Sequence, residues 1–388
     1  MTNFSATKRF HLWMPNIFGF KGGVQVYSAY FLQALQNLYP TSQYDVFLKH
    51  DVVAGPNLTY LPQTRFHFAG RVPLKLRTPA FAAQLVGQGL LQRPDLIITT
   101  HLNFTIAAHY LKRLTGIPYW AIAHGVEAWD LRKPALQAAL READRILCVS
   151  AYTRDRLLKE QALSPAQLAL LPNTFDASRF QIKPKPLPLL QQYNLRPDQP
   201  VLLTVNRLAA TESYKGYDKV LEALPQVLKH FPDIHYLIVG KGDDQPRLQQ
   251  RIRQMGLQNQ VTLTGFIPDR ELCDYYNLCD VFVMPSKLEG FGIVYLEALA
   301  CGKPVIGGNQ DGAVDALCQG KLGALVNPDG IEDIARTITQ ILEKAYPNPL
   351  MYQPEGLRAA VIAQYGFQPF QQKLEKSIQG FCSSSQWK

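Results

Sequence analysis

One stretch in the second half of the chain constrains its fold more than any other part. Residues 279–284 are apolar and rich in Val and Phe, which predicts a short buried strand. A turn with Gly290 and Gly292 follows, and residues 293–300 have the composition of a helix. A Gly-Lys-Pro sequence ends that helix, and residues 305–306 begin another apolar strand. The stretch therefore predicts a strand, a glycine turn, a helix and a second strand in direct succession.

The same alternation runs through the rest of the chain. In the first half, we predict strands at residues 9–14, 43–49, 94–99, 118–123, 145–149 and 168–172, and helices at 24–38, 135–142 and 151–160. In the second half, we predict further strands at 201–205, 235–239 and 261–263, and helices at 218–229, 269–278, 330–345 and 367–380. Strands that alternate with helices form parallel sheets covered on both faces. The predicted class is therefore α/β.

The length of the chain indicates two domains. A chain of 388 residues is too long for one compact domain, and two domains of roughly 180 residues each fit it. Residues 180–200 are rich in proline and lack periodicity, as an interdomain linker does. We predict a first domain at 1–178, a linker at 179–199 and a second domain at 200–365.

Composition argues against several protein classes. The chain is 47% hydrophobic and 18% charged, which is typical of a soluble globular protein. It has no run of about eighteen apolar residues that would cross a membrane, and Lys8 and Arg9 interrupt its N-terminus before any signal-peptide core. We therefore expect a cytoplasmic protein. The six cysteines form no Cys-x-x-Cys pair, which favours reduced, buried thiols over disulfides or a zinc site.

Positive charge is concentrated in the first half. Residues 1–178 hold 18 Lys and Arg against 10 Asp and Glu, so we expect anionic partners for this half. The segment 64–83 interleaves apolar residues with four cations, Arg65, Arg71, Lys75 and Arg77. Three interpretations are open: a solvated loop and helix face, a patch that contacts anionic headgroups or a lipid diphosphate acceptor, and a nucleic-acid contact.

The glycine turn before residue 293 has the geometry of a phosphate site. A strand–turn–helix unit directs backbone N–H groups and the positive end of the helix dipole at a ligand above the turn. Glu289 and Glu297 flank this turn, and eight residues of helix rise by about 12 Å. This is the scale of a diphosphate with a hydroxyl-bearing ring at each end, and carboxylates accept hydrogen bonds from such hydroxyls.

The two glutamates also carry a family resemblance. Seven residues separate Glu289 from Glu297, and A-C-G-K-P-V-I follows. This pattern resembles the Glu-x7-Glu signature of retaining GT-B glycosyltransferases, in the large bacterial family called glycosyltransferase family 4-like, group 1. The resemblance implies two Rossmann-like domains that face each other across a cleft, with the C-terminal helix, in residues 366–388, packed back on the first. It further implies that Glu289 binds the donor sugar and Glu297 the ribose.

Other residues of the second half match the family less closely. The resemblance implies that Arg207 and Lys215 clamp the donor diphosphate, although Asn206 stands where the family commonly has glycine and the loop between them is slightly long. It implies that Phe266 and Ile267 frame the nucleotide base. It also implies that the four residues after Glu289 bind the donor; these are Gly290, Phe291, Gly292 and Ile293.

The first half carries two weaker motifs. Lys21-Gly22-Gly23 lies between a predicted strand and a helix, and in the family such a Gly-Gly turn lies against the donor phosphates or the acceptor. An H-G-x-E sequence, with His124 and Glu127, directly follows another predicted strand, where α/β proteins bind ligands. The resemblance implies that His124 contacts the donor sugar, and that Glu127 supports it or the acceptor.

Together these features predict a retaining, metal-independent glycosyltransferase. It would move a hexose from a nucleoside-diphosphate sugar, UDP-glucose first and GDP-mannose next, to a hydroxyl of a saccharide or lipid-linked acceptor, in polysaccharide biosynthesis. His124, Arg207, Lys215 and Glu289 are the expected catalytic residues. The sequence has no Asp-x-Asp triplet to hold a metal, so we expect no metal and no cofactor. The basic first half would permit peripheral contact with an anionic membrane, at the inner face of the plasma membrane.

Two other classes of function are weighed against this prediction. A sugar-nucleotide epimerase or a phosphorylase could share the fold, but nothing singles out the pyridoxal lysine of a phosphorylase. A basic nucleic-acid-binding protein would suit the charge, but the chain lacks the aromatic and basic β-surface or helix-turn-helix of such proteins. We therefore expect no nucleic acid among its partners.

Overall fold

The structure is a computed structural model that describes residues 7–19, 22–55 and 60–382. It divides into two compact units. Unit 1 contains the described residues up to Thr174 together with the C-terminal segment from Phe367, and unit 2 runs from Phe175 to Gly366. The sequence suggested boundaries at residues 178 and 365, and the segment expected as a linker, 179–199, belongs to unit 2.

Unit 1 is built on a seven-stranded parallel sheet in the order β3-β2-β1-β4-β5-β6-β7. Its strands are β1 (Arg9–Met14), β2 (Gln43–Leu48), β3 (Thr64–Phe68), β4 (Leu96–Thr99), β5 (Tyr119–Ala123), β6 (Arg145–Cys148) and β7 (Leu168–Leu170). Its α-helices are α1 (Gly23–Leu38), α2 (Leu74–Gln92), α3 (Thr105–Thr115), α4 (Pro134–Arg141), α5 (Ala151–Glu160) and α14 (Phe367–Cys382). Three short 3₁₀-helices lie in its loops, η1 (Leu102–Phe104), η2 (Val126–Ala128) and η3 (Pro165–Gln167).

Unit 2 is built on a six-stranded parallel sheet in the order β10-β9-β8-β11-β12-β13. Its strands are β8 (Val201–Val205), β9 (His235–Val239), β10 (Val261–Gly265), β11 (Val281–Met284), β12 (Val305–Gly308) and β13 (Ala324–Val326). Its α-helices are α6 (Leu187–Gln192), α7 (Tyr217–Val227), α8 (Gln245–Gln254), α9 (Leu272–Leu278), α10 (Ile293–Ala300), α11 (Ala313–Ala316), α12 (Ile331–Leu342) and α13 (Pro354–Tyr365). Its 3₁₀-helices are η4 (Ala210–Lys215), η5 (Asp269–Glu271) and η6 (Pro349–Tyr352).

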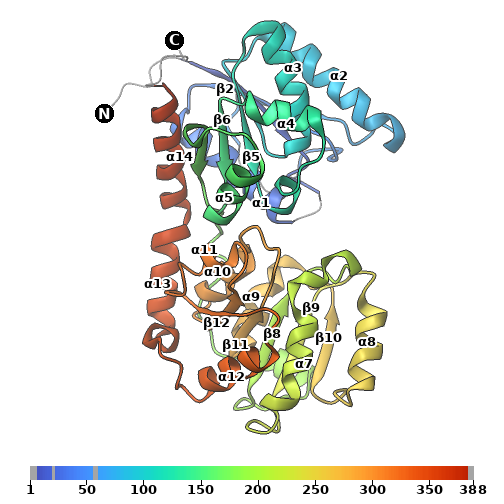
Figure 1. Cartoon of the computed structure of the whole chain (residues 1–388), viewed down its shortest axis with the longest axis vertical. Coiled ribbons are helices and arrows are strands. Elements are labelled where there is room, and N and C mark those ends of the chain that lie inside the picture. Colours follow the sequence, from blue (N-terminus) through green and yellow to red (C-terminus); the bar gives the residue numbers. More distant parts are fainter. Residues whose placement is uncertain (1–6, 20–21, 56–59, 383–388) are drawn as a thin grey trace. The chain divides into compact units, whose positions relative to one another are not determined.

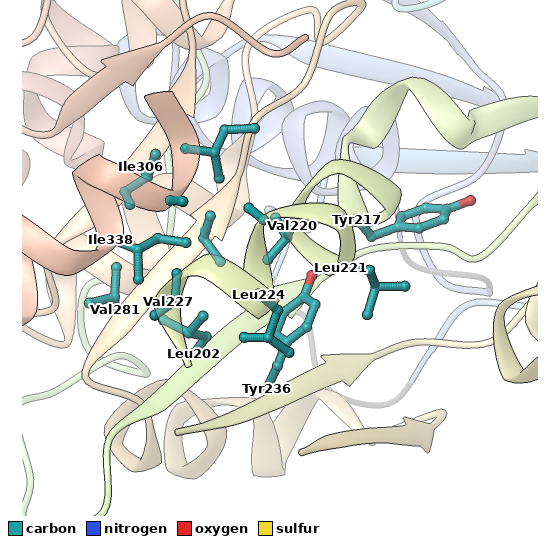
Figure 2. Close-up of a cluster of buried hydrophobic side chains, with 14 of the residues drawn as sticks. Leu202, Tyr217, Val220, Leu221, Leu224, Val227, Tyr236, Val281, Ile306 and Ile338 are labelled. Carbon is teal, nitrogen blue, oxygen red and sulfur yellow. The ribbon is translucent and has the colours of Figure 1, made fainter. Parts of the chain in front are cut away.

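Apolar periodicity explains the core of unit 2. Helix α7 buries residues spaced three or four apart, among them Val220, Leu224 and Val227. Figure 2 shows these side chains beside Leu202 of β8 and Ile338 of α12. Helix and sheet therefore share one apolar layer, which holds the carboxyl ends of the strands in fixed positions.

The C-terminal helix belongs to unit 1, as the family resemblance implied. Helix α14 lies beside α1 in the structure (Figure 1). The ring of Phe370 meets that of Tyr27 at a centroid distance of 5.6 Å, and Phe381 meets Trp120 at 5.3 Å. Arg145 Nη1 donates a hydrogen bond to the carbonyl of Ser377 at 3.2 Å. The last helix thus completes the core of the first sheet.

In the segment 64–83, the helix of the first interpretation is present, but a strand stands where that interpretation had a loop. Thr64–Phe68 is the edge strand β3, and α2 runs from Leu74 through Pro79 to Gln92. As an edge strand, β3 is only partly buried and carries Arg65 on an exposed position, so it lacks the continuous apolar run of a central strand. The sequence pattern therefore understated the order of this region.

The described cysteines are free thiols, and most of them are buried. Cys148, Cys273, Cys279 and Cys301 are buried free thiols, and Cys318 is a free thiol of intermediate exposure. The side chain of Cys382 lies outside the described residues. Among the described helices, none is both long enough and apolar enough to cross a membrane.

Candidate functional site

The turn between β11 and α10 depends on a glycine that no other residue can replace without strain. Gly292 has φ +91°, and a Cβ at this position would lie 2.4 Å from the ring of Tyr295. Gly292 also caps α10 without a side-chain hydrogen bond, so the first N–H groups of the helix are left for a ligand. Phe291 is different from its neighbours, because its ring is buried against Tyr365 and only its backbone can face a ligand.

Asp311 fixes this turn by hydrogen bonds, and the sequence analysis did not predict Asp311 as a site residue. Its buried carboxylate accepts hydrogen bonds from Ser286 Oγ at 2.7 Å, from the N–H of Glu289 at 2.7 Å and from the N–H of Ala313 at 2.9 Å. Burial raises the pKa of Asp311 to about 7, although these donors oppose the rise. The signal in the sequence was an acidic residue three positions after a strand, at the carboxyl edge of the sheet.

Lys215 and Glu289 form an ion pair beside the turn, although they are far apart in the sequence. Both side chains are only 16% exposed. Burial alone would lower the pKa of Lys215, but the Glu289 carboxylate outweighs burial and the pKa lies above its usual value. A Cβ at the adjacent Gly216 would lie 2.2 Å from the carbonyl oxygen of Pro285, so the two loops touch through their backbones. The structure therefore brings together two of the predicted catalytic residues.

Arg207 lies in the same loop region but has a different partner. Its guanidinium pairs with Glu212, and its side chain is 65% exposed. Lys215 Nζ lies 5.5 Å from the centre of the Tyr214 ring, and burial raises the pKa of that phenol, on which the charges of both ion pairs also act. Arg207 is therefore an exposed cation in the same loop region as the Lys215–Glu289 pair. Within the described residues, no hydrogen bond joins Arg207 to either member of that pair.

Glu297 lies one turn into α10 and is held by the neighbouring helix. The hydroxyl of Tyr276, in α9, donates a hydrogen bond to Glu297 Oε2 at 2.7 Å. Burial raises the pKa of Glu297 to about 7, and the Tyr276 hydroxyl and the charge of Arg179 oppose that rise. Glu297 is thus a carboxylate in a fixed orientation whose charge changes near neutral pH.

The residues expected to frame a nucleotide base lie at the carboxyl end of β10. The side chain of Phe266 is 63% exposed, and Lys241 Nζ lies 5.1 Å from the centre of its ring. Ile267, the next residue, is half-buried. An exposed aromatic ring offers a face on which a planar base can stack. Lys241 was not among the predicted site residues, since a lysine after a strand has no distinctive sequence signal.

In unit 1, His124 follows β5 in a fixed tautomer. Its Nε2 lies 3.0 Å from the carbonyl oxygen of Thr100 and donates the proton to it, which leaves Nδ1 as an acceptor. The ring of Tyr27 meets the imidazole edge-on at 4.9 Å. Burial lowers the pKa of His124 to about 4, so the ring is neutral at physiological pH.

Glu127 is directed back toward its own loop. Its Oε1 accepts the N–H of His124 at 2.5 Å. Burial raises its pKa, and the N–H groups around it, led by that of His124, oppose the rise. Glu127 therefore holds the backbone of His124, and its contact with a donor or acceptor stays a prediction.

The predicted Gly-Gly turn begins helix α1. Gly22 caps the helix in an extended conformation without a side-chain hydrogen bond, and Gly23 is the first helical residue. Lys21 lies outside the described residues. The preceding loop is held by Asp51, whose carboxylate accepts the N–H groups of Ile17 at 2.7 Å and Gly19 at 2.8 Å. Asp51 is another acidic residue near a strand end that sequence reasoning missed.

No group of three or more acidic, histidine or cysteine side chains with the spacing of a metal site occurs in the described part of the chain.

Two family models match successive parts of the chain. The model described as glycosyl transferases group 1 matches residues 189–353, and the model described as glycosyltransferase family 4 matches residues 21–179. The chain is also 34% identical over 234 residues to a GDP-mannose-dependent alpha-(1-6)-phosphatidylinositol monomannoside mannosyltransferase of Mycolicibacterium smegmatis. That match covers 57% of this chain and 60% of the relative, so the chain spans about 60% of the length of this curated relative.

A further relative and two solved structures extend the comparison over more of the chain. The 2-deoxystreptamine glucosyltransferase of Streptomyces kanamyceticus is 25% identical over 79% of this chain and 83% of its own length. Sucrose-phosphate synthase from Thermosynechococcus elongatus aligns with 97% of this chain and 100% of its own, with a TM-score of 0.78 and 22% identity. Anabaena HepE in complex with UDP-glucose aligns with 96% of this chain and 99% of its own, with a TM-score of 0.75 and 19% identity.

Proposed function

Because this chain belongs to the glycosyl transferases group 1 and has the GT-B fold, we propose that it moves a hexose from a nucleoside-diphosphate sugar to a hydroxyl of its acceptor. The observation that carries the proposal is the Lys215–Glu289 ion pair beside the uncapped N-terminus of α10. Backbone N–H groups and a lysine together provide an anion site, and an adjacent carboxylate can accept hydrogen bonds from sugar hydroxyls.

The diphosphate is the part of the donor that unit 2 suits best. Lys215 and the first N–H groups of α10 would bind it, and the exposed Arg207 would turn from Glu212 toward it. Negative charge grows on the diphosphate as the sugar leaves, and fixed positive groups stabilise that charge most in the transition state. Glu289, released from Lys215, would then accept hydroxyls of the sugar, and Glu297 those of the ribose.

The proposed chemistry retains the anomeric configuration without a covalent enzyme intermediate. The acceptor oxygen bonds to the anomeric carbon on the face from which the diphosphate departs, and the departing phosphate oxygen takes the acceptor's proton. Neutral His124, whose Nδ1 is a free acceptor in its tautomer, would accept a hydrogen bond from a donor hydroxyl. The two cations in unit 2 support a reaction independent of metal, which activity in a chelator would test.

The donor is proposed to be GDP-mannose, with UDP-glucose second. The mycobacterial relative at 34% identity is named as GDP-mannose-dependent, which raises GDP-mannose above the order that the sequence alone suggested. Phe266 and Lys241 would stack on and flank either base. For the acceptor, we propose a saccharide or lipid-linked hydroxyl, consistent with a role in polysaccharide or glycolipid synthesis.

A thermal-shift panel of nucleoside-diphosphate sugars is the first test. A donor that binds only the folded chain raises its unfolding temperature, and at equal concentration a tighter donor raises it more. The effective donor is then followed by NMR with an added sugar acceptor, and the product should carry the donor's anomeric configuration. Inversion would refute the proposed mechanism. Turnover to an isomeric nucleotide sugar without any acceptor would instead establish an epimerase, and no binding by any member of the panel would refute the proposed function.

We also propose that unit 1 contacts an anionic membrane. Four exposed apolar side chains lie on two adjacent segments, Val52 and Val53 after β2, and Leu74 and Leu76 at the start of α2. The segments are joined where the N–H of Gly70 donates to the carbonyl of Asp51 at 3.0 Å. Exposed cations, Arg71 and Lys75, surround the apolar residues. Apolar residues within a basic surface are typical of peripheral membrane binding.

Vesicle sedimentation tests this contact. Vesicles of phosphatidylglycerol should sediment the protein, and vesicles of phosphatidylcholine should not. The double change Leu74→Ser and Leu76→Ser should reduce binding strongly, while Leu91→Ser, an exposed leucine near the other end of the same helix, should not. Equal binding to both lipids would contradict an electrostatic contribution, and equal binding of all variants would contradict the assigned surface.

A further inference from the structure

A group of basic side chains lies at the carboxyl ends of two strands of unit 1, and the proposed donor chemistry does not use it. Lys49 and His50 directly follow β2, and their N–H groups bond to the end of β1 at Met14 and Pro15, at 3.2 and 2.8 Å. His101 follows β4, on the other side of β1. The backbone thus fixes these residues at the edge where α/β sheets bind ligands.

Arg77 completes the group from helix α2. Its Nη2 donates to the carbonyl of Gly70 at 2.7 Å and its Nε to that of Val72 at 3.1 Å. Its Nη1 lies 3.5 Å from Nδ1 of His50, at the limit of a hydrogen bond. With Nδ1 facing a donor, His50 carries its proton on Nε2 and presents that proton on the opposite side of its ring. The guanidinium is therefore held by two carbonyls without being neutralised.

The two carboxylates nearest this group form their hydrogen bonds with backbone N–H groups of neighbouring loops. The Asp51 carboxylate accepts three N–H groups of the loop at residues 17–19. Glu127 accepts the N–H of His124. Within the described residues, no carboxylate forms an ion pair with Lys49, His50 or Arg77. Burial lowers the pKa of His50 first, and the charges of Lys49 and Arg77 lower it further, against the opposing charge of Asp51.

We propose that Lys49, His50 and Arg77 form a phosphate-binding subsite, and that the acceptor substrate carries a phosphate group bound there. This inference rests on the proposed function, and it extends it by naming a chemical feature of the acceptor. Unit 2 has its own cations for the donor diphosphate, Lys215 and Arg207, so the basic group of unit 1 is left for the other substrate. Three cationic or N–H-donating side chains match the several oxygens of a phosphate.

Two sources could supply this phosphate, a soluble sugar phosphate or the headgroup of a phospholipid. The shared feature is a phosphate ester within reach of His50 Nε2 and the Lys49 ammonium. The exposed apolar residues Val52 and Leu76 lie beside members of the group in the sequence and would suit a lipid. The experiment therefore includes a soluble and a membrane-bound probe.

The imidazole resonances of His50 provide a direct readout in the full-length protein. Titration with glycerol 3-phosphate, and separately with vesicles of phosphatidylinositol against phosphatidylcholine, should move these resonances and raise the pKa of His50, because a nearby anion favours the charged ring. Lys49→Gln should weaken binding of the effective probe by about tenfold or more. Arg113→Gln, which removes the same charge from an exposed position of α3, should leave binding unchanged.

The outcomes separate the subsite from the proposed function. Response to glycerol 3-phosphate supports a soluble acceptor, and response only to phosphatidylinositol vesicles supports a lipid one. If neither probe moves the His50 resonances, or if Lys49→Gln and Arg113→Gln weaken binding equally, the subsite is refuted. Thermal stabilisation by a nucleotide sugar in the same sample would show that the proposed function survives that refutation. The unfolding temperature of Lys49→Gln, compared with that of the wild type, shows whether lost binding comes from misfolding.

Discussion

At the scale of single residues, Lys215 has two roles that can be separated experimentally. Its ammonium pairs with Glu289 in the free protein, and in the proposed reaction it stabilises the departing diphosphate. Lys215→Met should reduce kcat/KM by about 100-fold or more, as loss of one preorganised charge does in other enzymes. Glu289→Gln should also remove most activity, because an amide accepts fewer hydroxyl hydrogen bonds than a carboxylate. Steady-state kinetics with the donor found by thermal shift would measure both.

The matched control for Lys215 is Lys185. The side chain of Lys185 is also 16% exposed and pairs with the carboxylate of Asp280 at 2.7 Å. Asp280 directly precedes β11, so this pair lies at the amino end of the strand, away from the turn before α10. Lys185→Met should lower stability to a similar extent and leave kcat/KM near that of the wild type. If Lys215→Met and Lys185→Met lost activity equally, the effect would come from stability and the assigned role of Lys215 would be wrong.

If Glu297 binds the ribose as proposed, the affinity for the donor should depend on pH. Burial raises its pKa to about 7, and only the charged form accepts both ribose hydroxyls well. Donor affinity should therefore rise with pH up to about 7, by at most about tenfold per pH unit, and then level off. Calorimetric titration with a nucleotide sugar measures this cleanly, since its diphosphate diester does not titrate near neutrality.

The same raised pKa acts in the opposite sense on the free protein. A carboxyl group with a raised pKa contributes its full stabilisation of the fold at pH values below its usual pKa of 4.5, and that contribution is lost as pH rises through about 7.

Glu297→Gln should flatten the dependence of donor affinity on pH while keeping the turn intact, because Asp311 still holds the turn. An unchanged slope in Glu297→Gln would assign the titration to another group.

At this scale, the sequence predicted residues that act through their own side-chain chemistry and missed those that act through the backbone. Lys215 and Glu289 stand in a motif, and the structure places them in contact. Asp311 and Asp51 were missed, because each acts by accepting N–H groups of a turn that only the folded chain brings near. Glu127 accepts the backbone N–H of His124, a contact that the sequence does not indicate, and its support of a substrate stays a prediction.

At the scale of elements, the turn before α10 should tolerate no side chain at Gly292. Gly292→Ala forces a left-handed conformation on alanine and places its Cβ 2.4 Å from the Tyr295 ring. The conformational part alone costs about 1–2 kcal/mol, and the clash adds to it. Urea unfolding should therefore show a loss greater than that amount, and donor binding should weaken because the N–H groups of α10 move.

Gly256 is the control for the backbone strain that a left-handed alanine causes. It has φ +70° in the same unit, and a Cβ there would meet no atom within 4 Å. Gly256→Ala should cost only the conformational strain and leave donor binding unchanged. Equal losses of stability in Gly256→Ala and Gly292→Ala would mean that Tyr295 moves aside and that the turn is less rigid than its contacts indicate.

Elements with a strong apolar signal were predicted closely, and polar or peripheral ones were not. The predicted strand at 9–14 and helix at 293–300 have the bounds of β1 and α10. Helix α8 was missed because its sequence is polar and buries only Leu248 and Ile252, one helical turn apart. Strand β3 was missed because an edge strand needs no continuous apolar run. Burial, which depends on neighbours far along the chain, decides such cases.

At the scale of the whole molecule, the chain closes unit 1 only with its last helix. Unit 1 takes in α14 after the chain has formed all of unit 2. The family resemblance implied this return, whereas periodicity alone indicated only a helix at 367–380. Leu374 and Phe370 are buried in unit 1. Stability of the first sheet therefore depends on residues more than two hundred positions away in sequence, such as Ser377, which bonds to Arg145.

Core truncations should therefore act within one unit at a time. Leu374→Ala removes a fully buried side chain from α14 and should cost about 2–5 kcal/mol. Hydrogen–deuterium exchange should then speed up in α1 and the strands of unit 1, since α14 packs on α1, while unit 2 keeps its protection. Ile338→Ala, a matched truncation in the core of unit 2, should produce the converse pattern. If either change loosened both units equally, the two would unfold as one cooperative body, and donor binding by unit 2 would then depend on the C-terminal helix as well.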